Sequence, residues 1–129
     1  MRVAILNVVE SGHNAINAFK RFLPEGEEVV FSQNLFTGKV DLNKETLKRA
    51  VDKVDEALAA AFSGTGAEKI YVVLTGPYVL AFTVLQRIMR AASGVPVVIA
   101  QWDMASRKYL FFSIDELSDI LYKPFLSGE

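Results

Sequence analysis

Cysteine is absent from this chain of 129 residues, and histidine occurs once, at His13. The first absence excludes disulfide bonds and thiolate metal ligands and is typical of a cytoplasmic protein. The second excludes the paired histidines of common metal sites. No apolar run reaches the roughly 18 to 20 residues that a membrane span needs, and the start lacks a signal-peptide cleavage pattern. We therefore expect a cytoplasmic protein with no membrane span, no metal and no cofactor.

An excess of charge of one sign is also missing. Fourteen basic and fifteen acidic side chains give a formal net charge of -1, so binding to duplex nucleic acid is not expected. Hydrophobic residues make up 51% of the chain and charged residues 22%, which indicates a folded chain with a proper core. The length predicts one α/β domain over residues 1–129.

The standard nucleotide and hydrolase motifs do not occur either. The sequence contains neither G-x-G-x-x-G nor a P-loop, and no G-x-S-x-G nucleophile turn. A function must therefore be sought in how the fold brings separate loops together.

Strand-like and helix-like segments alternate along the chain. This alternation predicts parallel βαβ units and an open sheet covered by helices on both faces. The fold class we expect is α/β, a three-layer Rossmann-like (flavodoxin-like) sheet that is mostly parallel, with an antiparallel edge hairpin. The expected strands are residues 2–8, 27–31, 70–74, 97–101 and 109–112.

Helix boundaries follow from local signals. A short amphipathic helix with Phe19 and Phe22 on its apolar face ends at Pro24, and Asn43 caps a long second helix. Pro77 suits the first position of a third helix, and Ser113 begins a capping box that starts a fourth helix reaching Tyr122. Residues 32–42 form the least regular segment.

The third predicted helix is apolar around nearly all of its circumference. Thr83, Gln86, Arg87 and Arg90 make its only polar stripe. A helix of this kind is buried on more than one side, either centrally or against a second subunit. We expect a homodimer.

Ligands of open α/β sheets bind beyond the carboxyl ends of the strands, near the change in strand order. That rule selects three loops, residues 7–14, 75–78 and 102–108. Their hydroxyls, amides, cations and aromatic rings suit a ligand with phosphates and stackable bases. The candidate ligand-binding residues are Asn7, Ser11, Gly12, Asn14, Thr75, Gly76, Pro77, Tyr78, Trp102, Ser106 and Lys108.

The candidate catalytic residues are His13, Asp103 and Arg107. Histidine titrates near neutral pH and can move a proton, and a cation can hold developing phosphate charge. Each candidate also has a structural interpretation. His13 is then a polar residue at a helix start, Asp103 a turn residue and Trp102 a packed ring at a strand end.

Two segments carry a resemblance to a known group. They are VVLTGP followed by an apolar helix, and PVVIAQWD followed by a polar turn and an aromatic strand. Together with the opening ILN, the nearby His13 and Val40-Asp41-Leu42, this pattern resembles the CRISPR-associated Rossmann-fold (CARF) and SAVED group. It looks closest to small stand-alone CRISPR-associated ring nucleases.

The resemblance implies a homodimer that binds a cyclic oligoadenylate second messenger across its two-fold axis. It further implies metal-independent cleavage, in which a ribose 2′-hydroxyl attacks the adjacent phosphorus and leaves a 2′,3′-cyclic phosphate. Such cleavage switches off the signalling of type III CRISPR antiviral defence. Two other classes remain open: a non-catalytic sensor or sponge for cyclic nucleotides, and a flavodoxin-like protein-interaction module.

Overall fold

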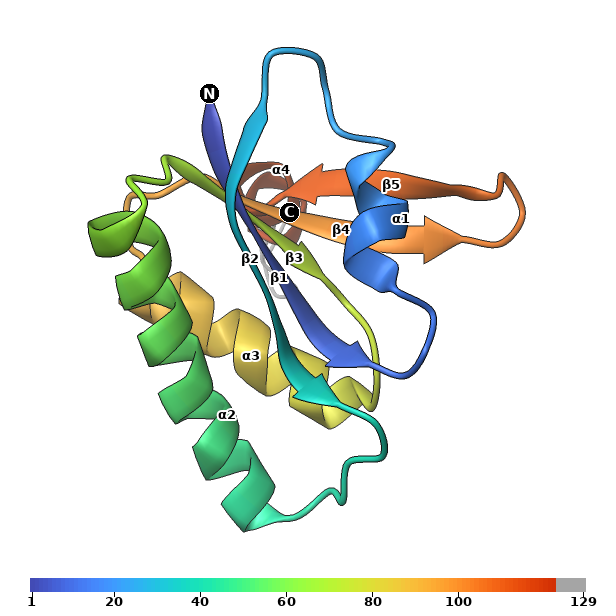
Figure 1. Cartoon of the computed structure of the whole chain (residues 1–129), viewed down its shortest axis with the longest axis vertical. Coiled ribbons are helices and arrows are strands. Elements are labelled where there is room, and N and C mark those ends of the chain that lie inside the picture. Colours follow the sequence, from blue (N-terminus) through green and yellow to red (C-terminus); the bar gives the residue numbers. More distant parts are fainter. Residues whose placement is uncertain (123–129) are drawn as a thin grey trace, which may run out of the picture.

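A computed structural model describes residues 1–122 of the chain, as a five-stranded sheet in the order β2-β1-β3-β4-β5 (Figure 1). The first four strands are parallel, and β5 runs antiparallel to β4. This confirms the predicted fold class. The strands are β1 (Arg2–Glu10), β2 (Glu28–Thr37), β3 (Lys69–Val73), β4 (Val97–Asp103) and β5 (Lys108–Ser113).

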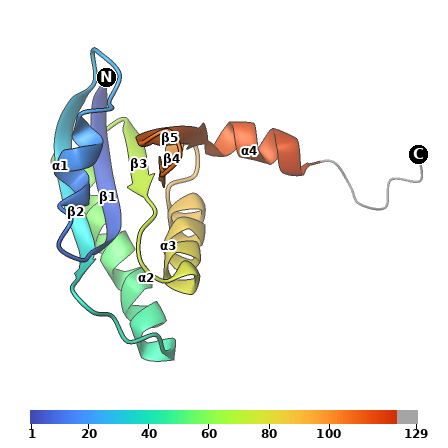
Figure 2. The ribbon, with the colours of Figure 1, turned by 90° about the vertical axis from the view of Figure 1, so that its right-hand side faces the viewer.

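Helices cover the two faces of the sheet unequally. Among residues 1–122, one face carries α2 and α3, whereas the opposite face carries only the short α1 (Figure 2). Successive side chains of β1 point to opposite faces of the sheet. Most of them are apolar, so both faces are hydrophobic at the centre of the sheet. The helices are α1 (Ala15–Lys20), α2 (Lys44–Leu58) with a π-helical continuation (Ala59–Gly64), α3 (Tyr78–Ala91) and α4 (Ile114–Leu121).

Strand β2 is longer than predicted. It continues to Thr37 through the segment that the sequence marked as irregular, because β1 offers pairing partners as far as Glu10. A register shift between Val3 and Ala4 accommodates one extra residue in β2. This part of the strand was missed because Ser32 to Asn34 are polar. Polar residues are tolerated there because β2 lies at the edge of the sheet.

Two helix boundaries also differ from the prediction. Helix α1 ends at Lys20, so Phe22 lies in the turn after it rather than on its apolar face. Pro77 is the N-cap of α3 with extended backbone, one residue before the first helical position. Both predicted side-chain caps are confirmed: Asn43 accepts from the amide of Thr46, and Ser113 accepts from the amide of Glu116.

Candidate functional site

The carboxyl ends of β1, β3 and β4 lie side by side at one edge of the sheet. Because β2 lies on one side of β1 and β3 on the other, the strand order changes direction between β1 and β3. This is the position at which open α/β sheets bind ligands. The three loops selected from the sequence all leave this edge, as predicted.

A hollow of about 460 Å³ opens here on the α1 side of the sheet. Its volume lies in the range of small-molecule sites. It brings together His13 from the first loop, Thr75 from the second and Trp102 from the end of β4. The full lining is His13, Ala15, Ala18, Thr75, Trp102, Met104 and Tyr109.

Aromatic rings form one wall of this hollow. Trp102 meets Tyr109 nearly edge to face, with ring centroids 5.2 Å apart, and meets Phe22 at 6.2 Å. The indole Nε1 donates to Met104 Sδ at 3.1 Å, and 39% of Trp102 remains exposed. Burial, and to a smaller extent the charge of Glu10, raise the pKa of Tyr109. The indole is thus fixed from one side and accessible from the other.

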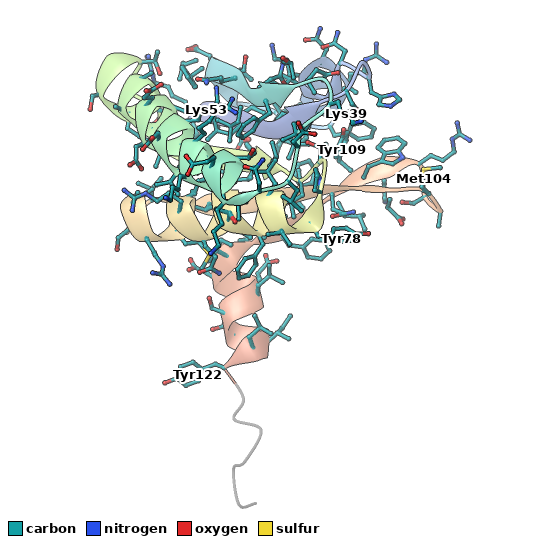
Figure 3. All side chains as sticks on the ribbon, turned by 90° about the horizontal axis from the view of Figure 1, so that it is seen from below. Lys39, Lys53, Tyr78, Met104, Tyr109 and Tyr122 are labelled. Atoms are coloured by element: carbon teal, nitrogen blue, oxygen red, sulfur yellow. The ribbon has the colours of Figure 1, made fainter. Side chains whose placement is uncertain are left out.

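Tyr109 and Met104 were not among the predicted site residues. The register of the hairpin pairs Trp102 directly with Tyr109, so the antiparallel pairing expected from the sequence contained the signal for Tyr109. Figure 3 shows Tyr109 near the body of the sheet and Met104 at the end of the hairpin.

The turn after β1 is occupied by a side chain of the protein itself. The carboxylate of Glu10 accepts from the amides of Gly12 at 2.8 Å, Asn14 at 2.7 Å and Ala15 at 2.9 Å. These amides, above all those of Ala15 and Asn14, lower the pKa of Glu10. A phosphate placed on Gly12 and Asn14 would have to displace Glu10. Sequence reasoning missed this role, although an acid just before a Gly-containing helix start is the signal for it.

A second network joins the ends of three strands. The hydroxyl of Thr75 donates to Asn7 Oδ1 at 2.7 Å and accepts from the amide of Val9 at 2.8 Å. The Nδ2 of Asn7 then donates to Asn34 Oδ1 at 3.0 Å. Asn7 is fully buried, so its side chain positions the strands and presents no surface to a ligand. The hydroxyl proton of Thr75 is likewise donated within this network. Asn34 also belongs to the network, and the sequence did not indicate it.

The turn after β3 requires glycine at position 76. Gly76 has a φ of +79°, and a Cβ there would lie 2.5 Å from Val9 Cγ2. Beyond Pro77, helix α3 begins with Tyr78, which is 93% exposed, and has no acidic residue in its first turn. A second hollow of about 340 Å³ opens on the α3 side, and its lining includes Thr75, Gly76, Tyr78 and Phe82. Thr75 therefore separates two hollows.

The turn between β4 and β5 is held by Asp103. Its carboxylate accepts from the hydroxyl of Ser106 and from the amide of Ser106, the latter at 3.1 Å. These bonds, the hydroxyl first, lower the pKa of Asp103. Arg107 has a φ of +54° and donates its amide to the carbonyl of Asp103. The turn thus gives Asp103 and Ser106 structural partners and leaves the side chains of Arg107 and Lys108 exposed.

The structure therefore gathers some predicted residues and separates others. His13, Thr75 and Trp102 share one hollow, and Gly76 and Tyr78 line the other. Ser11, Gly12 and Asn14 lie in the turn of Glu10.

Within residues 1–122, no group of three or more histidine or acidic side chains is arranged to hold a metal ion. In the same part of the chain, every helix is too short or too polar to cross a membrane.

No protein-family model and no curated protein matches the sequence. Among solved structures, the chain is similar to the Acinetobacter baumannii Cap4 SAVED/CARF-domain containing receptor with the cyclic trinucleotide 3′3′3′-cAAA. The TM-score is 0.62 at 18% identity, over 85% of this chain and 23% of the receptor chain. The same receptor with 2′3′3′-cAAA gives a TM-score of 0.60 at 19% identity, over 84% of this chain and 23% of that one. This chain thus spans about a quarter of the receptor's length and is similar in fold to that part of the receptor.

Proposed function

We propose that this protein binds a cyclic oligoadenylate at the carboxyl edge of its sheet. The observation that carries the proposal is the hollow shared by His13, Thr75 and Trp102 at the change in strand order. The likeness in fold to a receptor with cyclic trinucleotides supports the choice of ligand class.

The chemistry of the hollow suits an adenine base. A purine ring stacks on an exposed aromatic face and gains about 1 to 3 kcal/mol by doing so. Trp102 offers such a face, because Tyr109 and Phe22 meet it and fix its orientation. Tyr78, beside the second hollow, offers another aromatic ring for a neighbouring nucleotide.

Phosphates of the ring would lie near the remaining donors of this edge. The first-turn amides of α3 point toward the edge without an acidic side chain beside them, and a helix N-terminus favours an anion. Arg107 and Lys108 supply two cations on the hairpin turn. In this arrangement the turn of Glu10 takes no phosphate, because its amides already hold a carboxylate.

Titration calorimetry with cyclic tri-, tetra- and hexa-adenylate, without metal, tests binding. The linear tri-adenylate is the control, because it carries the same bases without the closed ring. Saturable heat with one ring size, and a weaker response to the linear molecule, is the expected result. Absence of heat and of thermal stabilisation with all three rings would overturn the proposal and favour an interaction module.

Ring cleavage is a second candidate function, and the place of His13 in the hollow favours it. His13 would take the proton of a ribose 2′-hydroxyl as its oxygen attacks the adjacent phosphorus. The bond from phosphorus to the 5′-oxygen breaks, that oxygen gains a proton, and a 2′,3′-cyclic phosphate remains. Asp103 is less suited to this step, since its carboxylate is bonded to Ser106.

Chromatography of the same incubations separates cleavage from binding. Products that form with the wild-type chain and not with His13→Ala, at unchanged affinity, support cleavage with His13 as the base. Binding without products identifies a sensor or sponge. The proposal also includes a homodimer, because a two-fold pair of hollows matches a symmetric ring. As the resemblance implies, we further propose that the protein acts in the cytoplasm, as part of type III CRISPR antiviral defence.

A further inference from the structure

Helix α3 exposes an apolar stripe that its own chain leaves uncovered within residues 1–122. Tyr78, Phe82, Leu85 and Met89 recur at intervals of three and four residues, so they share one side of the helix. Of these, Phe82 is 63% exposed, and Leu85 lies half-buried beside it. The inner side of α3, with Leu80 and Val84, packs on the sheet and is separate from this stripe.

Helix α4 projects from the face of the sheet that α3 covers (Figure 2), and Figure 3 shows Tyr78, at the start of the stripe, on that same side. None of the side chains in residues 114–121 is fully buried. Its apolar residues Leu117, Ile120 and Leu121 nevertheless gather on one side, and Ile120 and Leu121 are 72% and 79% exposed. An amphipathic helix with its apolar side in water lacks the partner that normally stabilises it.

Helix α4 does not lie along the stripe of its own chain: it projects away from the sheet (Figure 2), and only its first residues, Ile114 and Asp115, share a hollow with Met89. Ser113 is the last residue of β5 and also the N-cap of α4, so no loop separates the two elements. Its hydroxyl accepts from the amide of Glu116 at 3.0 Å and caps the helix directly at the end of the strand.

Charge indicates what kind of partner fits. The described part of α4 carries Asp115, Glu116 and Asp119 and no basic residue, whereas α3 carries Arg87 and Arg90 and no acidic residue. Arg87 is engaged with Asp55 at 2.7 Å. Arg90 is exposed, and no ion pair to it is found among the described residues. An acidic amphipathic helix therefore suits the rim of the α3 stripe.

We propose that α4 of a second copy of this chain docks along the α3 stripe, and that the exchange is reciprocal about a two-fold axis. Leu117, Ile120 and Leu121 of one copy then lie against Phe82, Leu85 and Met89 of the other. Glu116, which borders the apolar side of the arriving helix, then lies near Arg90. Such an interface is self-complementary, as a two-fold dimer requires. The inference rests on these two helices and not on the proposed ligand.

Sedimentation velocity of the full chain tests the dimer. The wild-type chain is expected to be a dimer, and Ile120→Glu with Leu121→Glu is expected to raise its dissociation constant at least about 30-fold, as does Phe82→Glu. Ser118→Glu, on the polar side of α4, is the matched control and leaves the dimer intact. Because all these side chains are at least partly exposed, the variants are expected to fold, and circular dichroism checks that they do.

A crosslink identifies the docked pair, since the chain has no cysteine of its own. Chains with Phe82→Cys are mixed with chains with Leu121→Cys and oxidised, and mass spectrometry distinguishes the mixed dimer from the two like pairs. A predominant mixed dimer is expected, and replacement of the second partner by Ser118→Cys abolishes it. A monomeric wild-type chain would overturn the proposal. So would a dimer that only Phe82→Glu breaks, which would mean that the two stripes face each other. Phe82 also lines the second hollow, so ligand titrations that report separately on the proposed function use only the α4 variant, Ile120→Glu with Leu121→Glu.

Discussion

Two turns leave the same edge of the sheet, yet they are held in different ways. The turn after β1 is organised by charge, because Glu10 gathers three backbone amides around its carboxylate. The turn after β3 is organised by shape, because Gly76 fits against Val9 and the hydroxyl of Thr75 is enclosed by the strands. The first turn thus already holds an anion, whereas the second leaves the start of α3 open to one.

Gly76→Ala is the most damaging change that this comparison predicts. The new Cβ would meet Val9 at 2.5 Å in a left-handed backbone, so we expect a loss of roughly 3 kcal/mol in the free energy of unfolding. Urea denaturation measures it. Gly38→Ala is the matched control, because Gly38 has a φ of +74° and a Cβ there would have no atom within 4 Å. It should cost only about 1 kcal/mol, and equal losses at both sites would refute the role of shape.

Thr75→Val removes the hydroxyl that links β1 to the turn after β3. The amide of Val9 and the Oδ1 of Asn7 each lose a partner, and we expect about 2 kcal/mol of destabilisation by the same measurement. Thr75→Ser keeps the hydroxyl and serves as the control. If valine proves as stable as serine, the network does not hold the strands together.

Trp102→Ala probes the third loop, whose aromatic ring lines the hollow. We expect the dissociation constant of the cyclic oligoadenylate to rise about tenfold, because one base loses its stacking surface. Calorimetry measures this, and Trp102→Phe, which keeps an aromatic face, should lose less. Unchanged affinity in the alanine variant would place the base elsewhere.

Glu10→Gln tests the turn after β1 and should have the smallest effect. A neutral amide holds the helix start less well than a carboxylate, and we expect a loss of about 1 kcal/mol at neutral pH. Because folding lowers the pKa of Glu10, its stabilisation is fully present above the pKa of the unfolded carboxyl and is lost as pH falls through the lower, folded value.

The pH dependence supplies the control for that variant. Denaturation measured from neutral pH to below about pH 4.3 should show the wild-type chain losing its advantage over Glu10→Gln in the acidic range. A difference that stays constant across the whole range would mean that the charge of Glu10 is not what organises the turn.

Much of this arrangement could be predicted from the sequence because it depends on local signals. Buried strands, the caps at Asn43 and Ser113, and the antiparallel pairing of β4 with β5 each follow from short patterns of residues. Together they placed the three loops at one edge of the sheet.

The parts that were missed depend on contacts between distant residues. The polar segment after Phe31 becomes a strand only because β1 is beside it. Asn7 resembled a ligand contact until its partners, Asn34 and Thr75, enclosed it. Glu10 precedes a Gly-containing helix start, but only the structure shows that three amides turn toward its carboxylate.

At Ser113, strand β5 passes directly into α4, with no loop between the two elements. One end of β5, at Lys108, adjoins the turn beside the hollow, and the other end continues into α4 without a joint. A helix of eight residues is about 12 Å long, so a tilt of about 10° in the hairpin would carry the far end of α4 through about 2 Å. A change in the tilt of the hairpin beside the hollow would therefore also move α4, at the opposite end of β5.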